Sequence, residues 1–165
     1  MQLRSLNMDH PTYLKLKSFL EDRPICREAA RPLSKSAAVR IFFTDHEDEY
    51  QFRMQDGIPR LEPGQAEKPD FTLRLPTGAV DDLINLPEET IPAFGIKLME
   101  LVWTAAPERK ISATIHNGPV RLFAHGYFGI LAKGGMPVMR YLASRGFGQI
   151  GTIRKRMSQL VKPVE

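Results

Sequence analysis

Two stretches of this chain decide its fold: Val39-Arg40-Ile41-Phe42-Phe43 and, after a polar turn, Tyr50-Gln51-Phe52-Arg53-Met54-Gln55-Asp56-Gly57. Apolar side chains at every second position gather on one face of a β-strand, and both stretches have this period. The pair Asp56-Gly57 is typical of a tight hairpin turn. The sequence therefore predicts antiparallel strands with one apolar face and one face in water.

Three further segments carry strand signals. Residues 58–62 follow the Asp-Gly turn, and Pro59 restricts them to an edge strand or a short stub, because proline cannot donate a hydrogen bond to a neighbouring strand. The same alternation recurs in residues 71–75 and, much later, in residues 111–115. We therefore predict an α+β fold with a mainly antiparallel sheet of about five strands, one face of which is covered by helices.

Apolar residues at three- and four-residue spacings predict the covering helices. The expected helices lie within residues 9–20, 77–86, 88–104, 120–131, 138–144 and 150–161. Asp9 or Thr12 is the expected N-cap of the first helix. Thr77 is the expected cap of the second, which places Asp81 and Asp82 near the positive end of that helix.

Two connecting regions are less regular. Residues 23–36 contain two prolines and are expected to be a connector or a broken helix. Residues 120–131 fit a helical stripe, and we predict one helix there, although Gly126 and Gly129 each cost about 1 kcal/mol relative to alanine. Gly134-Gly135 is expected to end that helix, and Pro137 to begin the next.

The composition is that of an ordinary globular domain. The 165 residues are 42% hydrophobic and carry a net charge of +4, and the length predicts a single domain. The single cysteine, Cys26, excludes an intrachain disulfide and the common cysteine-based zinc sites. The sequence shows neither a secretory signal nor an apolar run of about 20 residues, so we expect a cytoplasmic location.

Residues suited to catalysis or metal binding are few. His46 lies in an acidic turn, which is more typical of a solvated loop than of a metal site. The string Gly146-Phe147-Gly148-Gln149-Ile150-Gly151 matches a dinucleotide-binding pattern, but the residues before it are predicted to be helical instead of forming a buried strand. We predict no metal, no cofactor and no catalytic residue, and we do not expect nucleic acid to bind.

Four short motifs stand in a characteristic order along the chain: Asp56-Gly57, Glu62-Pro63-Gly64, Pro69-Asp70 and Val80-Asp81-Asp82-Leu83-Ile84. Together with the alternating strand after Pro69-Asp70, they resemble the sterol carrier protein type 2 (SCP2) family over residues 37–132. The resemblance implies a sheet and helices that enclose a tunnel for a lipid, sterol or acyl chain, with no catalytic residue to carry over. The long helix at 88–104, the turn His116-Asn117-Gly118 and the tail beyond Gly134 depart from the family pattern.

The predicted ligand site is an apolar tunnel between sheet and helices. Residues 1–36 are expected to form an N-terminal helix and connector, residues 37–132 the lipid-binding domain, and residues 133–165 a basic helical extension of it. Ten side chains are predicted to line the tunnel: Phe43, Phe52, Met54, Leu73, Leu98, Val102, Ile115, Phe123, Tyr127 and Leu131. In the alternative interpretation, the same side chains form a filled core.

Three functions are open at this point, of which we favour a carrier for a hydrophobic small molecule. Such a carrier is expected to contact an anionic membrane or a protein partner through its basic C-terminal segment. The predicted contact residues there are Ile150, Ile153, Arg154, Lys155, Arg156, Met157 and Leu160. The alternatives are an accessory subunit of a lipid-modifying or quinone-biosynthesis complex, which acts through protein contacts, and a small lipid-acting enzyme that uses His116 and His125.

Overall fold

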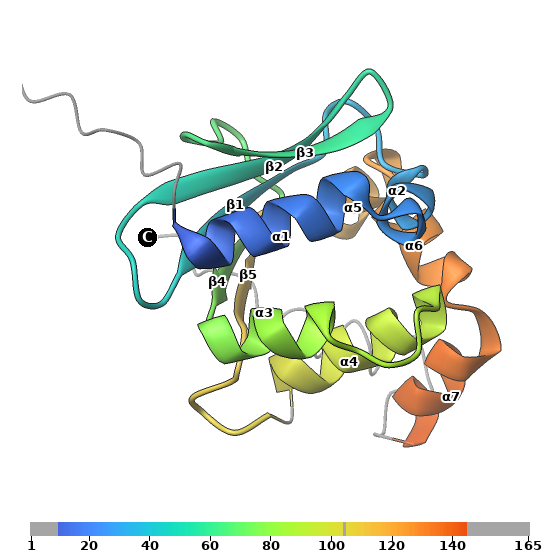
Figure 1. Ribbon diagram of the computed structural model, residues 1–165. Helices are drawn as coiled ribbons and strands as arrows, with labels where there is room; N and C mark the ends of the chain where they lie inside the picture. The colour runs from blue at the N-terminus through green and yellow to red at the C-terminus, as the bar shows by residue number, and fades with distance from the viewer. Residues whose placement is uncertain (1–9, 104, 145–165) are drawn as a thin grey trace, which may run out of the picture.

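The computed structural model describes residues 10–103 and 105–144, which have an α+β fold (Figure 1). Within these residues, the sheet has five strands in the order β3-β2-β1-β4-β5. The strands are β1 (Ala38–Phe43), β2 (Glu49–Gln55), β3 (Ile58–Pro63), β4 (Phe71–Leu75) and β5 (Ser112–Ile115). All five coincide with segments that the sequence predicts as strands.

The sheet is mainly antiparallel, as predicted. The pairs β1–β2, β2–β3 and β4–β5 are antiparallel, whereas β1 and β4 are parallel. In the turn between β2 and β3, Asp56 and Gly57 have φ angles of 53° and 76°, as a two-residue hairpin turn requires. Strand β3 lies at the edge of the sheet and is a full strand of six residues, not a stub.

Alternate side chains form one continuous apolar face across the sheet. Ile41 of β1, for example, lies opposite Tyr50 of β2 and Leu73 of β4. Fully or nearly buried side chains of this face include Val39, Ile41, Phe43, Tyr50, Met54, Leu61, Leu75 and Ile115. The opposite face carries polar and charged side chains such as Arg53 and Arg74, which are exposed. The predicted division into an apolar face and a wet face is confirmed.

Helices cover the apolar face (Figure 1). In the described residues they are α1 (Pro11–Asp22), α2 (Pro24–Ala30), α3 (Thr77–Ile84), α4 (Ile91–Trp103), α5 (Pro119–Ala124), α6 (Tyr127–Lys133) and α7 (Gly135–Ser144). Tyr13, Leu16 and Phe19 of α1 join the same core as Val80 and Leu83 of α3 and the buried strand residues. Helix α4 packs on α2, α3, α6 and α7.

The start of the N-terminal helical region differs from the prediction. His10 caps α1, because its Nδ1 accepts a hydrogen bond from the Tyr13 N–H at 3.4 Å, so the prediction of Asp9 or Thr12 as the cap is wrong. The region predicted as a connector or broken helix contains the short helix α2, which begins with Pro24 in its first turn. Proline is well suited to that position, since the first N–H groups of a helix have no partner within it.

Helices α3, α4 and α7 also begin at other residues than predicted. Pro76 stands at the N-cap of α3, so the prediction of Thr77 as its cap is wrong. Asp81 and Asp82 lie beyond the first turn and form ion pairs with cations from other segments, instead of interacting with the helix end. Helix α4 begins at Ile91, three residues later than predicted. Helix α7 begins at Gly135, where the sequence predicts the end of a helix.

The prediction of one helix over residues 120–131 is wrong, because the helix is interrupted at Gly126. This glycine stands between α5 and α6 with a φ of 94°. A Cβ atom at Gly126 would lie 1.9 Å from the carbonyl oxygen of Pro32. Glycine adopts this left-handed conformation at little cost and alone leaves room for that backbone. A contact with a distant segment therefore divides the helix.

We expect Gly126→Ala to destabilise the protein by at least about 2 kcal/mol, because a left-handed alanine is strained and its methyl group would overlap Pro32. Urea unfolding measures this loss. Gly118→Ala is the matched control, since nothing lies within 4 Å of a Cβ there and its φ of −74° suits any residue. Equal stability of the two variants would contradict a tight contact at Gly126.

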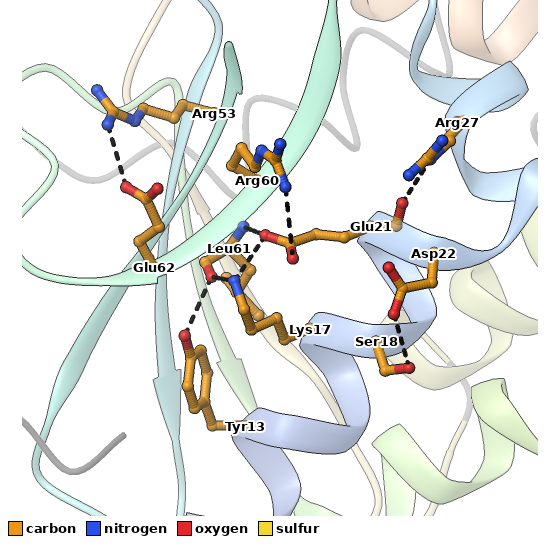
Figure 2. A network of polar contacts seen from close by, with 10 residues as sticks. All are labelled: Tyr13, Lys17, Ser18, Glu21, Asp22, Arg27, Arg53, Arg60, Leu61 and Glu62. Carbon is orange, nitrogen blue, oxygen red and sulfur yellow. Dashed lines mark hydrogen bonds and ion pairs between the residues drawn. The ribbon is translucent and has the colours of Figure 1, made fainter. Parts of the chain in front are cut away.

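Side chains of α1 cover the outer edge of β3 (Figure 2). The Leu61 N–H donates to Glu21 Oε1 at 3.0 Å. The Leu61 carbonyl accepts from the Tyr13 hydroxyl at 3.2 Å and from Lys17 Nζ at 3.0 Å. Glu21 is 6% exposed, and its charge is balanced by Lys17 at 2.8 Å and Arg60 at 4.0 Å. These contacts occupy backbone groups that a bare edge strand would offer to another chain.

We expect Glu21→Ala to cost about 2 kcal/mol, because it leaves the buried Leu61 N–H without its acceptor. Hydrogen exchange should show faster exchange of the Leu61 amide, and urea unfolding should show the loss of stability. Glu21→Gln keeps an oxygen acceptor and should recover part of both. Asp22→Ala, which removes an exposed contact with Ser18, is the control and should change neither.

Candidate functional site

The ten side chains predicted to line a ligand tunnel occupy three kinds of environment. The first group is buried in the core: Phe43, Met54 and Ile115 are 0%, 6% and 4% exposed. Phe43 belongs to the main core, together with residues of α1 and α3. Met54 packs instead with Ala30, Leu33 and Ala37 in a smaller cluster. These three side chains stabilise the fold from within it.

The second group is only partly buried and packs against the main core. It comprises Phe52, Leu73, Val102 and Tyr127. Phe71 of β4 is also partly exposed, and the Tyr127 ring meets it edge-on at a centroid distance of 4.8 Å. Phe52, Phe71 and Leu73 belong to β2 and β4, which both have neighbouring strands on each side. Interior strands normally bury the apolar side chains of their covered face. We name Phe52, Phe71, Leu73, Val102 and Tyr127 the candidate apolar site.

Helix α4 leaves much of its apolar surface partly exposed. Its sequence, IPAFGIKLMELVW, contains a single buried residue, Leu101. The Leu101 carbonyl accepts a hydrogen bond from the Ile111 N–H at 2.9 Å, which ties the end of α4 to the start of β5. Phe94 and Val102 of α4 are partly buried against the same core as the strand residues of the candidate apolar site. Both the sheet and α4 therefore offer accessible apolar side chains at this core.

The third group is exposed: Leu98, Phe123 and Leu131 are 42%, 72% and 37% exposed. Leu98 lies on α4, Phe123 on α5 and Leu131 on α6. The helical pattern of the sequence correctly places Phe123 and Leu131 on helices. It does not reveal that these side chains lie on the surface.

Two surface hollows lie away from the candidate apolar site. One, of about 820 Å³, is lined by Phe42, Thr44, Asp45, His46, Glu47, Asp48 and Arg74. The other, of about 320 Å³, is lined in part by Asp82, Lys97 and Arg109. Neither contains any of the ten predicted side chains. Charged walls do not suit a hydrocarbon ligand, which favours mainly apolar surroundings.

Asp70 is a fully buried carboxylate at the start of β4. Its Oδ2 accepts hydrogen bonds from the Ala38 N–H at 3.1 Å and the Tyr127 hydroxyl at 2.8 Å. Its Oδ1 accepts from the Asn117 side-chain amide and lies 2.8 Å from His125 Nδ1. An ionised carboxylate has about four acceptor positions and no donor, so all of these positions are used and Nδ1 carries the proton in its contact.

The break at Gly126 allows two neighbouring helices to reach this one carboxylate. Residues two apart in a continuous helix point about 200° away from each other, so His125 and Tyr127 could not both contact Asp70 from one helix. Burial and the hydrogen bond to Asp70 raise the pKa of the Tyr127 hydroxyl well above its usual value. The hydroxyl therefore stays protonated and remains a donor.

The two histidines considered for catalysis have different partners. His125 contacts Asp70, whereas His116 Nε2 lies 2.6 Å from Thr72 Oγ1. Sequence reasoning does not identify Asp70 as the partner of His125. The sequence feature that marks Asp70 is its position, since it is an acidic residue between Pro69 and an apolar strand. Its role depends on residues that follow it by about 50 positions.

Within residues 10–103 and 105–144, no helix is long and apolar enough to cross a bilayer. No group of three or more His, Cys, Asp or Glu side chains there is arranged to hold a metal ion. Burial raises the pKa of the Cys26 thiol to about 11, so this thiol remains protonated near neutral pH. The predicted contact residues between 150 and 160 lie outside the described residues.

Comparison with known proteins gives a structural likeness. The sequence matches no family model and no curated protein. The structure is similar to a solved structure entitled "UbiJ-SCP2 Ubiquinone synthesis protein", with a TM-score of 0.42 and 11% sequence identity. The similarity covers 74% of this chain and 94% of that chain.

We expect Asp70→Asn to destabilise the protein by about 3 kcal/mol, because the new amide group would face two donors and leave them unpaired in the interior. Urea unfolding measures the loss, and the His125 and Tyr127 signals in NMR spectra should shift with it. Asp82→Asn is the control. It weakens a surface ion pair with Arg109 and should cost less than about 1 kcal/mol. An Asp70→Asn variant as stable as this control would contradict the network.

Proposed function

We propose that this protein is a non-catalytic carrier of a hydrophobic ligand, such as an acyl or isoprenoid chain. The observation that supports this most directly is the candidate apolar site, where Phe52, Phe71 and Leu73 stay partly exposed on interior strands. Hydrocarbon laid against these side chains removes apolar surface from water, which contributes about 25 cal/mol per Å². The ligand completes a core that the chain leaves partly open.

The ligand lies, in this proposal, between the apolar face of the sheet and helices α4 and α6. Val102 of α4 and Tyr127 of α6 pack against the same core and supply the facing side chains. A chain of ten methylene groups gains about 8 kcal/mol by burial, which corresponds to micromolar affinity before the cost of ordering the chain is subtracted. No polar group of the protein has to take part in a reaction for such binding.

Two further features support a carrier over an enzyme. The resemblance of residues 37–132 to the sterol carrier protein type 2 family implies a lipid tunnel in the same place. Thr72 and Asp70 hold the rings of His116 and His125 respectively, as expected for histidines that stabilise the fold. Asp70 is surrounded by donors of the protein itself, as expected for a group that holds the fold together.

Ala113→Leu tests whether space remains above the sheet. Ala113 lies on the apolar face opposite Leu73 and is partly exposed. We expect the wild-type protein to take up a fluorescent fatty acid saturably. The added leucine side chain should weaken this uptake at least tenfold, while urea unfolding changes by less than about 1 kcal/mol, because the side chain fills the space meant for the ligand.

Ser112→Leu is the matched control for this test. Ser112 precedes Ala113 on β5 and lies on the opposite, exposed face of the sheet, so the same leucine there should leave uptake unchanged. A filled core would instead make Ala113→Leu unstable by about 1–3 kcal/mol, through overpacking. That result, or a wild-type protein without saturable uptake, would overturn the proposed function.

A further inference from the structure

Helices α5 and α6 expose a group of large apolar side chains that we name the Phe123 patch. Its members are Val120, Phe123, Phe128 and Leu131, which are 85%, 72%, 38% and 37% exposed. Single exposed apolar residues are normal on protein surfaces, whereas a contiguous group marks a site of interaction.

The geometry makes these four side chains contiguous. Val120 and Phe123 are three residues apart on α5, and Phe128 and Leu131 are three apart on α6, so each pair shares one side of its helix. The rings of Phe123 and Phe128 join the two pairs, with centroids 6.0 Å apart. Helix α7, which contacts α6, also exposes Met136 and Met139, at 62% and 47%.

The helices that carry the patch have charges of one sign. Residues 109–164 contain no aspartate or glutamate, and the formal charges on α5, α6 and α7 are those of Arg121, Lys133 and Arg140. Arg121 donates to the side-chain oxygen of Asn117 at 3.5 Å, and Lys133 donates to the carbonyl of Glu28 at 2.7 Å. Both of these partners are neutral groups, so the two positive charges remain available to an anionic partner.

We propose that the Phe123 patch docks on the surface of an anionic lipid bilayer. The apolar side chains enter the boundary between headgroups and acyl chains, and the flanking cations contact the anionic headgroups. This surface is separate from the C-terminal segment that the sequence predicts as a membrane contact, and it consists entirely of described residues.

Charge also argues against two other occupants of the patch, a second copy of the chain and the C-terminal segment 145–165. A symmetric dimer through this surface would bring Arg121 of one copy close to the same cations of the other copy. Residues 145–165 carry five basic residues against Glu165, so a cover formed by this segment would also add charge of the same sign. A bilayer with anionic headgroups is the occupant whose charge complements the patch.

The docking proposal goes beyond the proposed function, because it rests on exposure and charge at α5 and α6 and needs no cargo. The two proposals also fail separately. Ala113→Leu, which is designed to block uptake, should bind vesicles like the wild-type protein. A substitution in the patch should leave the uptake of a fluorescent fatty acid in solution unchanged.

Val120→Glu in the full chain tests the docking surface. Val120 is the most exposed member of the patch and lies in the first turn of α5, where a carboxylate suits the positive helix end. Leu14→Glu is the matched control, since Leu14 is 46% exposed and lies in the first turn of α1. Both variants change the net charge equally.

Co-sedimentation with phosphatidylglycerol/phosphatidylcholine vesicles measures binding, and pure phosphatidylcholine vesicles report its dependence on charge. We expect the wild-type protein to prefer the anionic vesicles at least tenfold, Val120→Glu to lose about tenfold or more of that binding, and Leu14→Glu to keep it. Arg121→Gln should bind the anionic vesicles about fivefold more weakly than the wild-type protein.

Equal binding to both vesicle types, or full binding by Val120→Glu, would overturn the proposal. A solution dimer that Val120→Glu dissociates would also overturn it, since the patch would then be covered by a second copy.

Discussion

The carboxylate of Asp70 joins three parts of the chain that are distant in sequence. Removing a carboxylate from water costs several kcal/mol, and the fold offsets that cost by filling all four acceptor positions with donors. The backbone also takes part, since the Asp70 N–H donates to the Ala38 carbonyl at 2.7 Å and the Asp70 carbonyl accepts from the His116 N–H at 2.9 Å. The parallel pairing of β1 and β4 begins at the next residues, Val39 and Phe71. The start of that pairing and the placement of α5 and α6 therefore depend on one buried charge.

The position of α6 follows from this constraint. Gly126 turns the chain between His125 and Tyr127 so that both reach Asp70, and the absence of a side chain at Gly126 lets the turn rest against Pro32. Once Tyr127 is held by Asp70, its ring lies against Phe71 at the candidate apolar site. The next residue, Phe128, contacts Phe123 on the outer surface. Helix α6 thus carries side chains of both the candidate apolar site and the Phe123 patch.

The two apolar surfaces differ in what surrounds them. The candidate apolar site lies on the covered face of the sheet. It packs against a core to which α1 and α3 also contribute side chains. The Phe123 patch has basic side chains and no acidic side chain on its own helices. Burial of hydrocarbon suits the first, and adsorption to an anionic surface suits the second. A carrier that exchanges its cargo with a bilayer, as proposed for this protein, needs both kinds of surface.

Local patterns in the sequence determined the five strands, the hairpin turn at Asp56-Gly57 and the apolar face of the sheet, because alternation and turn chemistry act between neighbouring residues. They did not determine the break at Gly126 or the partners of Asp70, since both depend on contacts with residues far away in the chain. For the same reason, periodicity placed Phe43, Leu73 and Phe123 in one predicted site, although the structure makes the first buried, the second partly exposed and the third exposed. A period tells which side chains share a face of their own strand or helix, whereas tertiary packing decides how much of that face another element covers.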